Sequence, residues 1–307
     1  MKSFSEEISL GLSKKNKKIS SKWFYDFHGS KLFEKITKLE EYYPTRTERK
    51  ILKENKIEIA KKIGKEAVII EPGAGDTKKI AIFLNCLKKP KKYIPLDISE
   101  DYITKISQNF KKKFPKVAIT PKGYDFSSNN KPPFKIKSSE NIIIFFPGST
   151  IGNFETNEAV KFLKVLKSKF KAKKIIIGVD LVKDIPTLIS AYDDKKGVTA
   201  EFNKNILQRI NNELGGDINL NLYKHLAIYN TKKKRIEMRL KSRKNNNIKI
   251  NGSKYLIRKN EEIHTENSHK YTIKSFRNIV NKAGWKIKKT WVDDKKLFSI
   301  HFLNLDT

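Results

Sequence analysis

The chain has 307 residues, of which 38% are hydrophobic and 32% charged, and its formal net charge at pH 7 is +33. This length is enough for one large or two ordinary domains with a substantial core. No stretch approaches the roughly eighteen apolar residues of a membrane-spanning helix, and the polar N-terminal residues lack the apolar region of a secretory signal. We therefore expect a cytoplasmic protein.

The excess of basic residues suggests nucleic-acid binding, because Lys and Arg neutralise phosphates. Only eight of the 66 basic residues are Arg, however, and the lysines are spread over every polar segment. Side chains that read base edges are more often Arg. We expect no specific nucleic-acid partner, only salt-sensitive adhesion to polyanions.

Two residue types exclude further classes of site. A single cysteine, Cys86, cannot form an intramolecular disulfide framework. The histidines show no metal-ligand spacing, so we predict no metal site. They are His28, His225, His264, His269 and His301.

The N-terminal third begins with a polar, lysine-rich segment. We expect residues 1–20 to be a frayed lead-in, with the basic run 14–18 in solvent. An aromatic-rich stretch and a helical pattern follow. Pro44 ends this helix and starts another, with Thr45 and Glu48 at the spacing of a capping box.

A glycine turn follows the first apolar strand. Residues 67–70 are apolar and lead into Gly73 and Gly75, after which the pattern becomes helical. Glycine allows positive φ and close approach of a ligand to the helix N-terminus, although the same sequence also occurs as a plain β-to-α turn. About twenty residues later a second strand ends at Asp97, and an acid there can accept both hydroxyls of a ribose.

Strands and helices then alternate, which predicts a parallel sheet covered on both faces. Polar residues follow the strands and should converge on one crevice at their carboxyl ends. The expected strands are 67–71, 93–97, 117–120, 141–146 and 174–180, and the expected helices lie near 76–88, 100–113 and 155–170.

The alternation stops after Asp180. Residues 186–215 are helical in tendency, and strands are expected at 224–229, 235–242 and 255–258. This change indicates a second, inserted domain. A helix at 273–283 and two alternating strands at 285–292 and 297–303 close the chain. We predict an N-terminal helical segment contributing to the substrate domain at 1–60, a cofactor domain at 61–182, an inserted substrate-binding domain at 183–265, and a return to the cofactor domain at 266–307.

The polar residues favour S-adenosylmethionine over a dinucleotide. Asp97 would hold the ribose, Asp125 the adenine amine and Phe126 the adenine face. The turn lacks the third glycine of Gly-x-Gly-x-x-Gly, and Asp76 puts a negative charge where a pyrophosphate would lie. The alternative is a similar scaffold with solvated carboxylates.

Six segments in this order resemble the histidine-specific Nα-methyltransferases of ergothioneine biosynthesis, and the resemblance runs from about residue 23 to 302. The segments are 42–48, 148–154, 180–184, 191–194 with 197–203, 236–240 and 265–268. The resemblance implies a Rossmann-like class I methyltransferase sheet with a terminal β-hairpin and an inserted α+β substrate-binding domain. It also implies trimethylation of the α-amine of L-histidine by S-adenosylmethionine, giving hercynine. One alternative is a family member acting on another amino acid, and a second is a basic nucleic-acid-associated protein on a methyltransferase-like scaffold.

The resemblance also assigns roles to residues. The positions that hold the methyl donor are Tyr25, Gly73, Lys79, Asp97, Asp125 and Phe126. Those that hold the amine and carboxylate, and orient them for catalysis, are Tyr43, Asn153 and Tyr192. Those that line and read the imidazole are Met238, Glu266 and Ser268.

These assignments are chemically coherent. Glu266 and Ser268 can engage both imidazole nitrogens if their segment is extended, because residues two apart in a strand share a face. Methyl transfer needs an unprotonated amine in line with the donor, so we expect catalysis chiefly by orientation, with Tyr43 or a water as proton acceptor. We expect the enzyme to be a monomer.

Overall fold

The computed structural model describes residues 3–75, 77–126, 130–137 and 139–305, and divides the chain into two compact units. The large unit comprises Pro44–Val182 and Lys270–Thr307, and the small unit comprises Met1–Tyr43 and Lys183–His269. None of the helices in the described ranges combines the length and the hydropathy of a membrane-spanning segment.

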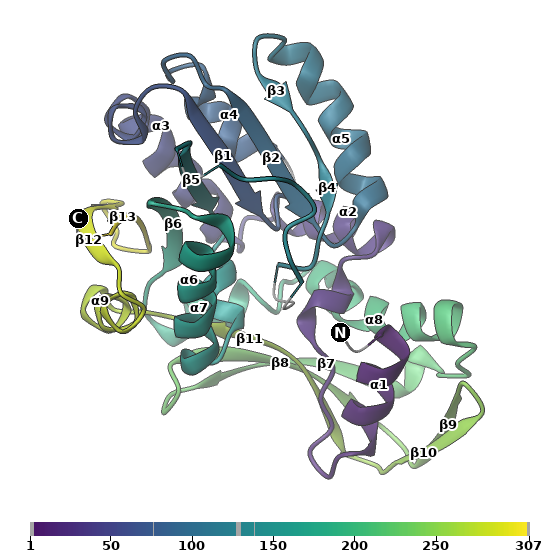
Figure 1. The fold of residues 1–307 in the computed structure, drawn as a ribbon. Helices are drawn as coiled ribbons and strands as arrows, with labels where there is room; N and C mark the ends of the chain where they lie inside the picture. The colour runs from purple at the N-terminus through teal and green to yellow at the C-terminus, as the bar shows by residue number, and fades with distance from the viewer. Residues whose placement is uncertain (1–2, 76, 127–129, 138, 306–307) are drawn as a thin grey trace. The chain divides into compact units, whose positions relative to one another are not determined.

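The large unit is built on an eight-stranded, mainly parallel sheet in the order β12-β13-β6-β5-β1-β2-β3, with β4 also paired to β2 (Figure 1). The strands are β1 (Ala67–Pro72), β2 (Lys92–Asp97), β3 (Ala118–Ile119), β4 (Lys122–Gly123), β5 (Asn141–Phe146), β6 (Lys174–Asp180), β12 (Lys286–Val292) and β13 (Phe298–Asn304). Strand β13 is antiparallel to both β6 and β12. The predicted α/β fold with a terminal β-hairpin is confirmed.

Helices cover both faces of this sheet, which explains why its central strands are almost wholly apolar. Val68 and Ile70 of β1 belong to one buried cluster, together with side chains of α6 and α9. Ala67 and Ile69 point to the other face and belong to a second cluster, with side chains of α3, α4 and α5. The helices are α3 (Tyr43–Ile63), α4 (Lys78–Leu84), α5 (Glu100–Lys113), α6 (Thr156–Phe170) and α9 (Ile273–Lys282), with a short 3-10 helix η2 (Thr150–Asn153).

The small unit combines helices with two antiparallel sheets, β11-β8-β7 and β10-β9. Its strands are β7 (Tyr223–Asn230), β8 (Arg235–Ser242), β9 (Asn246–Ile250), β10 (Ser253–Ile257) and β11 (Glu262–His269). Its helices are α1 (Phe4–Ser13), η1 (Ser21–Phe24), α2 (Phe27–Ile36), α7 (Ile185–Ser190), α8 (Val198–Leu214) and η3 (Leu220–Leu222).

The expectation of a frayed N-terminus was wrong. Ser3 and Glu6 form a reciprocal capping box at the start of α1, and the side chains of Ile8 and Leu12 are buried. The basic run is not simply solvated either, because Lys17 is buried and pairs with Glu261 at 3.2 Å. The backbone of residues 17–19 also pairs with His264, which attaches the segment to β11.

The expected boundary at residue 60 differs from the division that the structure makes at residue 43. Helix α3 belongs to the large unit because its apolar side chains, among them Ile51, Leu52 and Ile59, pack into a cluster of the large sheet. A polar helix with few apolar residues gave no sign in sequence of which core it would join. The roles assigned to the domains stay predictions.

Buried histidines should make the fold sensitive to acid. Burial lowers the pKa of His225, that of His264 to about 4 and that of His301 to about 3. Each is therefore neutral when folded but takes up a proton on unfolding below its ordinary pKa. His264 and His301 therefore contribute stability that is full above about pH 6.5 and is lost as the pH falls toward about 4, by about 1.4 kcal/mol per pH unit for each of the two. His225 acts in the same direction.

Chemical unfolding at several pH values measures this slope. Replacing His301 with Asn should remove the contribution of one proton from this slope. Burial raises the pKa of Asp97 and acts in the opposite sense at the acidic end of the window. A free energy of unfolding that stays constant over the window would contradict the neutral state of these histidines.

Candidate active site

The glycine turn after β1 has the geometry that its sequence predicted. Gly73 and Gly75 have φ of +66° and +49°, values that residues other than glycine rarely adopt. The Gly75 N–H donates to Asp97 Oδ2 at 3.2 Å. A Cβ added at Gly73 would lie 3.2 Å from the Phe126 ring, so the exposed backbone of Gly73 and this ring are in close contact. Asp76, expected to repel a pyrophosphate, lies outside the described residues.

Asp97 ends β2 and is 8% exposed. Its Oδ1 accepts from the Ser99 N–H at 3.0 Å while Oδ2 accepts from Gly75. Burial raises the pKa of the carboxyl, and the backbone N–H groups of Ser99, Gly75 and Ile98 act in the opposite direction. Each carboxylate oxygen has a second lone pair, so the group can still accept bonds from two hydroxyls.

Asp125 and Phe126 reach the same edge of the sheet through β4. Gly123 of β4 lies opposite Asp97, and the next residue, Tyr124, donates its N–H to the Asp97 carbonyl at 2.8 Å. The Phe126 ring also packs on Phe146, with ring centroids 5.9 Å apart. The structure therefore brings Gly73, Asp97, Asp125 and Phe126 together at the carboxyl ends of their strands.

Glu48 is a residue of this edge that the sequence did not identify. Its side chain, 1% exposed, pairs with Lys79 Nζ at 2.7 Å and accepts the Gly148 N–H with both oxygens at 2.9 Å. The expected capping box with Thr45 was therefore a wrong interpretation, because the carboxylate instead bonds α4 and the loop after β5. That loop leads into η2, which ends at Asn153.

Position 178 of β6 needs a glycine because the Glu48 side chain occupies the space of a Cβ there. A Cβ at Gly178 would overlap Glu48 Oε1, and that carboxylate is buried and bonded. We expect Gly178→Ala to lower the free energy of unfolding by about 2–4 kcal/mol, because either the backbone shifts or a buried charge loses its partners. Chemical unfolding would measure this loss.

A double-mutant cycle supplies the control for this prediction. In a Glu48→Ala background the added methyl group meets no carboxylate, so Gly178→Ala should cost much less. Equal costs in both backgrounds would show that the overlap with Glu48 is not the cause.

In the small unit, β11 presents two of the expected imidazole readers on one face. Glu266 and Ser268 are two residues apart and lie opposite Met238 and Ile236 of β8, beyond a bulge at Thr265. The segment is thus extended, as a shared face requires. The Ser268 hydroxyl is 2.7 Å from that of Tyr192, which follows α7. Tyr192, Met238, Glu266 and Ser268 are all buried.

The remaining expected residues of the small unit are aromatic. Tyr43 is 2% exposed, and its hydroxyl accepts from Lys183 Nζ at 2.6 Å. Tyr25 packs edge-on against the rings of Phe33 and Phe202, each at 5.7 Å between centroids. Lys183 was not among the predicted residues, since a lone lysine in a chain this basic carries no signal.

A buried polar network supports the Tyr192 segment and β11. Asn203 of α8 donates to His225 Nδ1 at 2.8 Å and accepts from the Thr265 hydroxyl at 2.7 Å. Since Nδ1 accepts, the proton of this neutral ring is on Nε2, which donates to the Tyr192 carbonyl at 2.8 Å. The network thereby fixes Tyr192 and Thr265 relative to each other. In sequence, Asn203 lies in a segment that carries the family resemblance, but it was assigned no role.

Comparison with known proteins identifies the family. Residues 4–305 match the family described as SAM-dependent histidine-specific methyltransferases. The chain belongs to this family. It is therefore an S-adenosylmethionine-dependent methyltransferase, as predicted, and the buried carboxylate of Asp97 and the open turn at Gly73 fit that cofactor.

The relatives that this chain matches carry names that refer to different substrates. The histidine N-alpha-methyltransferase of Mycolicibacterium smegmatis is 32% identical over 94% of this chain and 90% of its own length. That of Mycobacterium tuberculosis is 31% identical over 96% of this chain and 92% of its own. A 4-dimethylallyltryptophan N-methyltransferase of Claviceps purpurea is 27% identical over 64% of this chain and 60% of its own length.

Proposed function

We propose that this enzyme trimethylates the α-amine of L-histidine to give hercynine, the type of reaction used in ergothioneine biosynthesis. The observation that carries the proposal is the similarity, over more than nine tenths of the chain, to two histidine N-alpha-methyltransferases. The buried acceptor Glu266, on the same strand face as Ser268, gives the small unit a pair of groups suited to an imidazole.

The residues of the large unit are proposed to hold the methyl donor. Asp97 accepts the ribose hydroxyls, Gly73 lets the ligand approach the backbone, and Asp125 and Phe126 hold the adenine. When bound, S-adenosylmethionine supplies an electrophilic methyl group on a sulfonium sulfur. We propose that Lys79 also helps to hold the methyl donor. Its ammonium pairs with Glu48. Tyr25 is the remaining residue that we propose for holding the cofactor.

Three other residues are proposed to orient the amino acid. Tyr43, Asn153 and Tyr192 hold its amine and carboxylate, and Met238 lines the imidazole. The Lys183 ammonium fixes the Tyr43 hydroxyl, and Ser268 fixes that of Tyr192. Fixed donors and acceptors of this kind aim the nitrogen lone pair without forming a covalent intermediate. We further propose that the enzyme acts in the cytoplasm and is a monomer. Light scattering on the purified chain would measure its oligomeric state.

Incubation with radiolabelled S-adenosylmethionine and a panel of amino acids tests the proposal. We expect saturable labelling of L-histidine, with mono-, di- and trimethylated products resolved by mass spectrometry. The dimethylallyltryptophan relative makes an acceptor other than histidine the second candidate, and tryptophan and 4-dimethylallyltryptophan belong in the panel for this reason. Turnover of another acceptor without turnover of histidine would refute the first proposal.

A further inference from the structure

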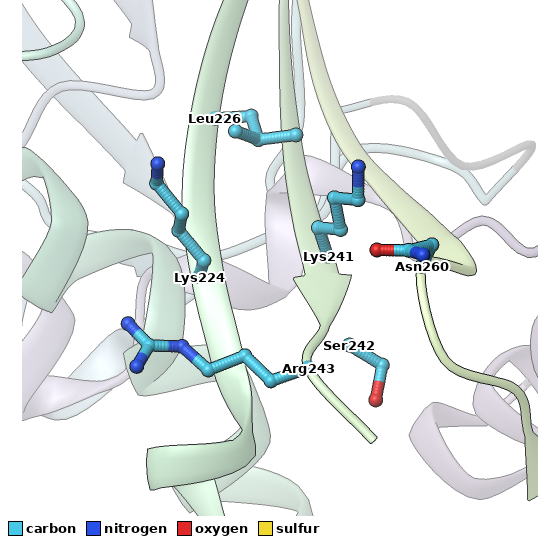
Figure 2. A pocket seen from close by; sticks show the side chains of 6 residues that line it. All are labelled: Lys224, Leu226, Lys241, Ser242, Arg243 and Asn260. Carbon is cyan, nitrogen blue, oxygen red and sulfur yellow. The ribbon is translucent and has the colours of Figure 1, made fainter. Parts of the chain in front are cut away.

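A basic cavity lies on the small unit, on the face of β7 and β8. Its volume is about 220 Å³, and it is lined by Lys224, Leu226, Lys241, Ser242, Arg243 and Asn260. Figure 2 shows the two lysine side chains on neighbouring strands, extending in the same direction with Leu226 between their ends. None of the lining residues is acidic.

The two lysines form a like-charge pair. Lys224 and Lys241 are direct cross-strand partners in the β7–β8 register. Like charges in this arrangement destabilise a sheet, since the side chains of opposite residues lie close together. Arg243 adds a third positive charge at the end of β8.

Acidic residues near the cavity are bonded to other cations. Glu262 lies opposite Lys241 on β11, yet its Oε2 pairs with Arg239. Arg239, the next basic residue on this face of β8, also pairs with Glu237. It therefore has two carboxylate partners. Glu261 pairs with Lys17. Among the described residues, no side chain forms an ion pair with Lys224, Lys241 or Arg243.

The surrounding sequence strengthens this charge imbalance. Residues 218–260 contain thirteen Lys and Arg but a single acidic residue, Glu237, which is buried and bonded to Arg235 and Arg239. Positive charges around a concave surface with apolar walls raise the local concentration of anions. The half-buried Leu226 is the apolar side chain of this lining.

We propose that this cavity binds a small phosphate monoester with an apolar group. Lys224 and Lys241 bind the phosphoryl oxygens through charge-assisted hydrogen bonds, and the positive charge of Arg243 adds to the attraction. Leu226 contacts the apolar part of the ligand. Bound phosphate offsets the repulsion between the paired lysines. The proposal of this anion site does not depend on the proposed methyl transfer.

The chain contains a matched control for the charge. Lys249 and Lys254 are also direct cross-strand partners, on β9 and β10, but they do not line the cavity. Changing both to Gln removes the same charge from the same kind of pair. A diffuse attraction to anions would be weakened equally by either double substitution.

Calorimetric titration of the full chain with phenyl phosphate tests the proposal. We expect saturable binding to the wild type and to Lys249→Gln/Lys254→Gln, and binding at least about tenfold weaker to Lys224→Gln/Lys241→Gln. Leu226→Ser should weaken phenyl phosphate binding but leave inorganic phosphate binding unchanged. Equal losses in the two double variants, or no saturable binding to the wild type, would overturn the proposal.

Two further measurements complete the test. The affinity for a short single-stranded oligonucleotide should fall by the same factor in Lys224→Gln/Lys241→Gln and in the control variant Lys249→Gln/Lys254→Gln. Binding of the oligonucleotide through these lysines, without phenyl phosphate binding, would assign the surface to nucleic acid instead. In phosphate-free buffer Lys224→Gln/Lys241→Gln should have a higher Tm than the wild type, because the repulsion is removed. A lower Tm would mean that the lysines are already stabilised within the chain, against the proposal.

Discussion

Replacing Asp97 with alanine will abolish measurable binding of S-adenosylmethionine. The carboxylate is buried at the edge of the sheet and is proposed to accept both ribose hydroxyls. Two charge-assisted hydrogen bonds at about 1.5–3 kcal/mol each correspond to a rise in Kd of about two to four orders of magnitude. Isothermal titration calorimetry with the purified variant measures this change.

The effect on the cofactor can be separated from an effect on folding. In Asp97→Asn, one backbone N–H loses its acceptor, but the cost of a buried charge whose pKa is raised by burial is removed as well. We therefore expect a Tm close to that of the wild type together with strongly weakened binding. Asp101, an exposed acid in the first turn of α5, provides the control, and Asp101→Ala should bind normally. Wild-type affinity in Asp97→Ala would exclude the proposed cofactor site.

Replacing Glu266 with alanine is expected to raise the KM for L-histidine by about ten- to a hundredfold. The proposed bond from the imidazole N–H to this buried carboxylate is charge-assisted and contributes about 1.5–3 kcal/mol. The imidazole is remote from the reacting amine, so kcat should change much less than KM. Steady-state kinetics with histidine as the varied substrate measures both constants.

The substrate preference provides a second test of Glu266. Glu266→Gln keeps an acceptor but removes the charge, and its KM should lie between those of the wild type and Glu266→Ala. Glu201→Ala changes an exposed acid in the first turn of α8 and should leave the KM unaltered. A Glu266→Ala variant that keeps the wild-type preference for histidine over other amino acids would refute the role in reading the imidazole.

The large unit could be predicted closely from the sequence. The apolar runs at 142–146 and 175–177 have no alternation, which is expected only of strands buried on both faces, and they became β5 and β6. The expected hairpin after the last helix became β12 and β13. The candidates Gly73, Asp97 and Asp125 also followed from this reasoning, because carboxyl ends of parallel strands meet at one edge, whereas Lys79 was implied only by the family resemblance.

The small unit was harder to predict. Strand β9, with the sequence Asn-Asn-Ile-Lys-Ile, was absent from the expected strands because turn-forming asparagines begin it. The N-terminal segment 17–19 pairs with β11, more than two hundred residues later. Hydrogen bonds between backbone groups carry no side-chain signature, so such long-range pairing is not visible in local patterns.

The sequence by itself determined the sheet, the glycine turn, the acidic end of β2 and the family, because each depends on a local pattern or on the order of motifs. Only the tertiary structure decided which polar side chains are bonded to each other. It showed that Glu48 bonds Lys79 and Gly148, that Lys183 holds Tyr43, and that Asn203 connects His225 with Thr265. The partners in these contacts are between 22 and 140 residues apart, and a polar residue in a basic sequence looks the same whether solvent or a buried partner satisfies it. The physical reason is that burial, which makes such bonds obligatory, is a property of the folded chain.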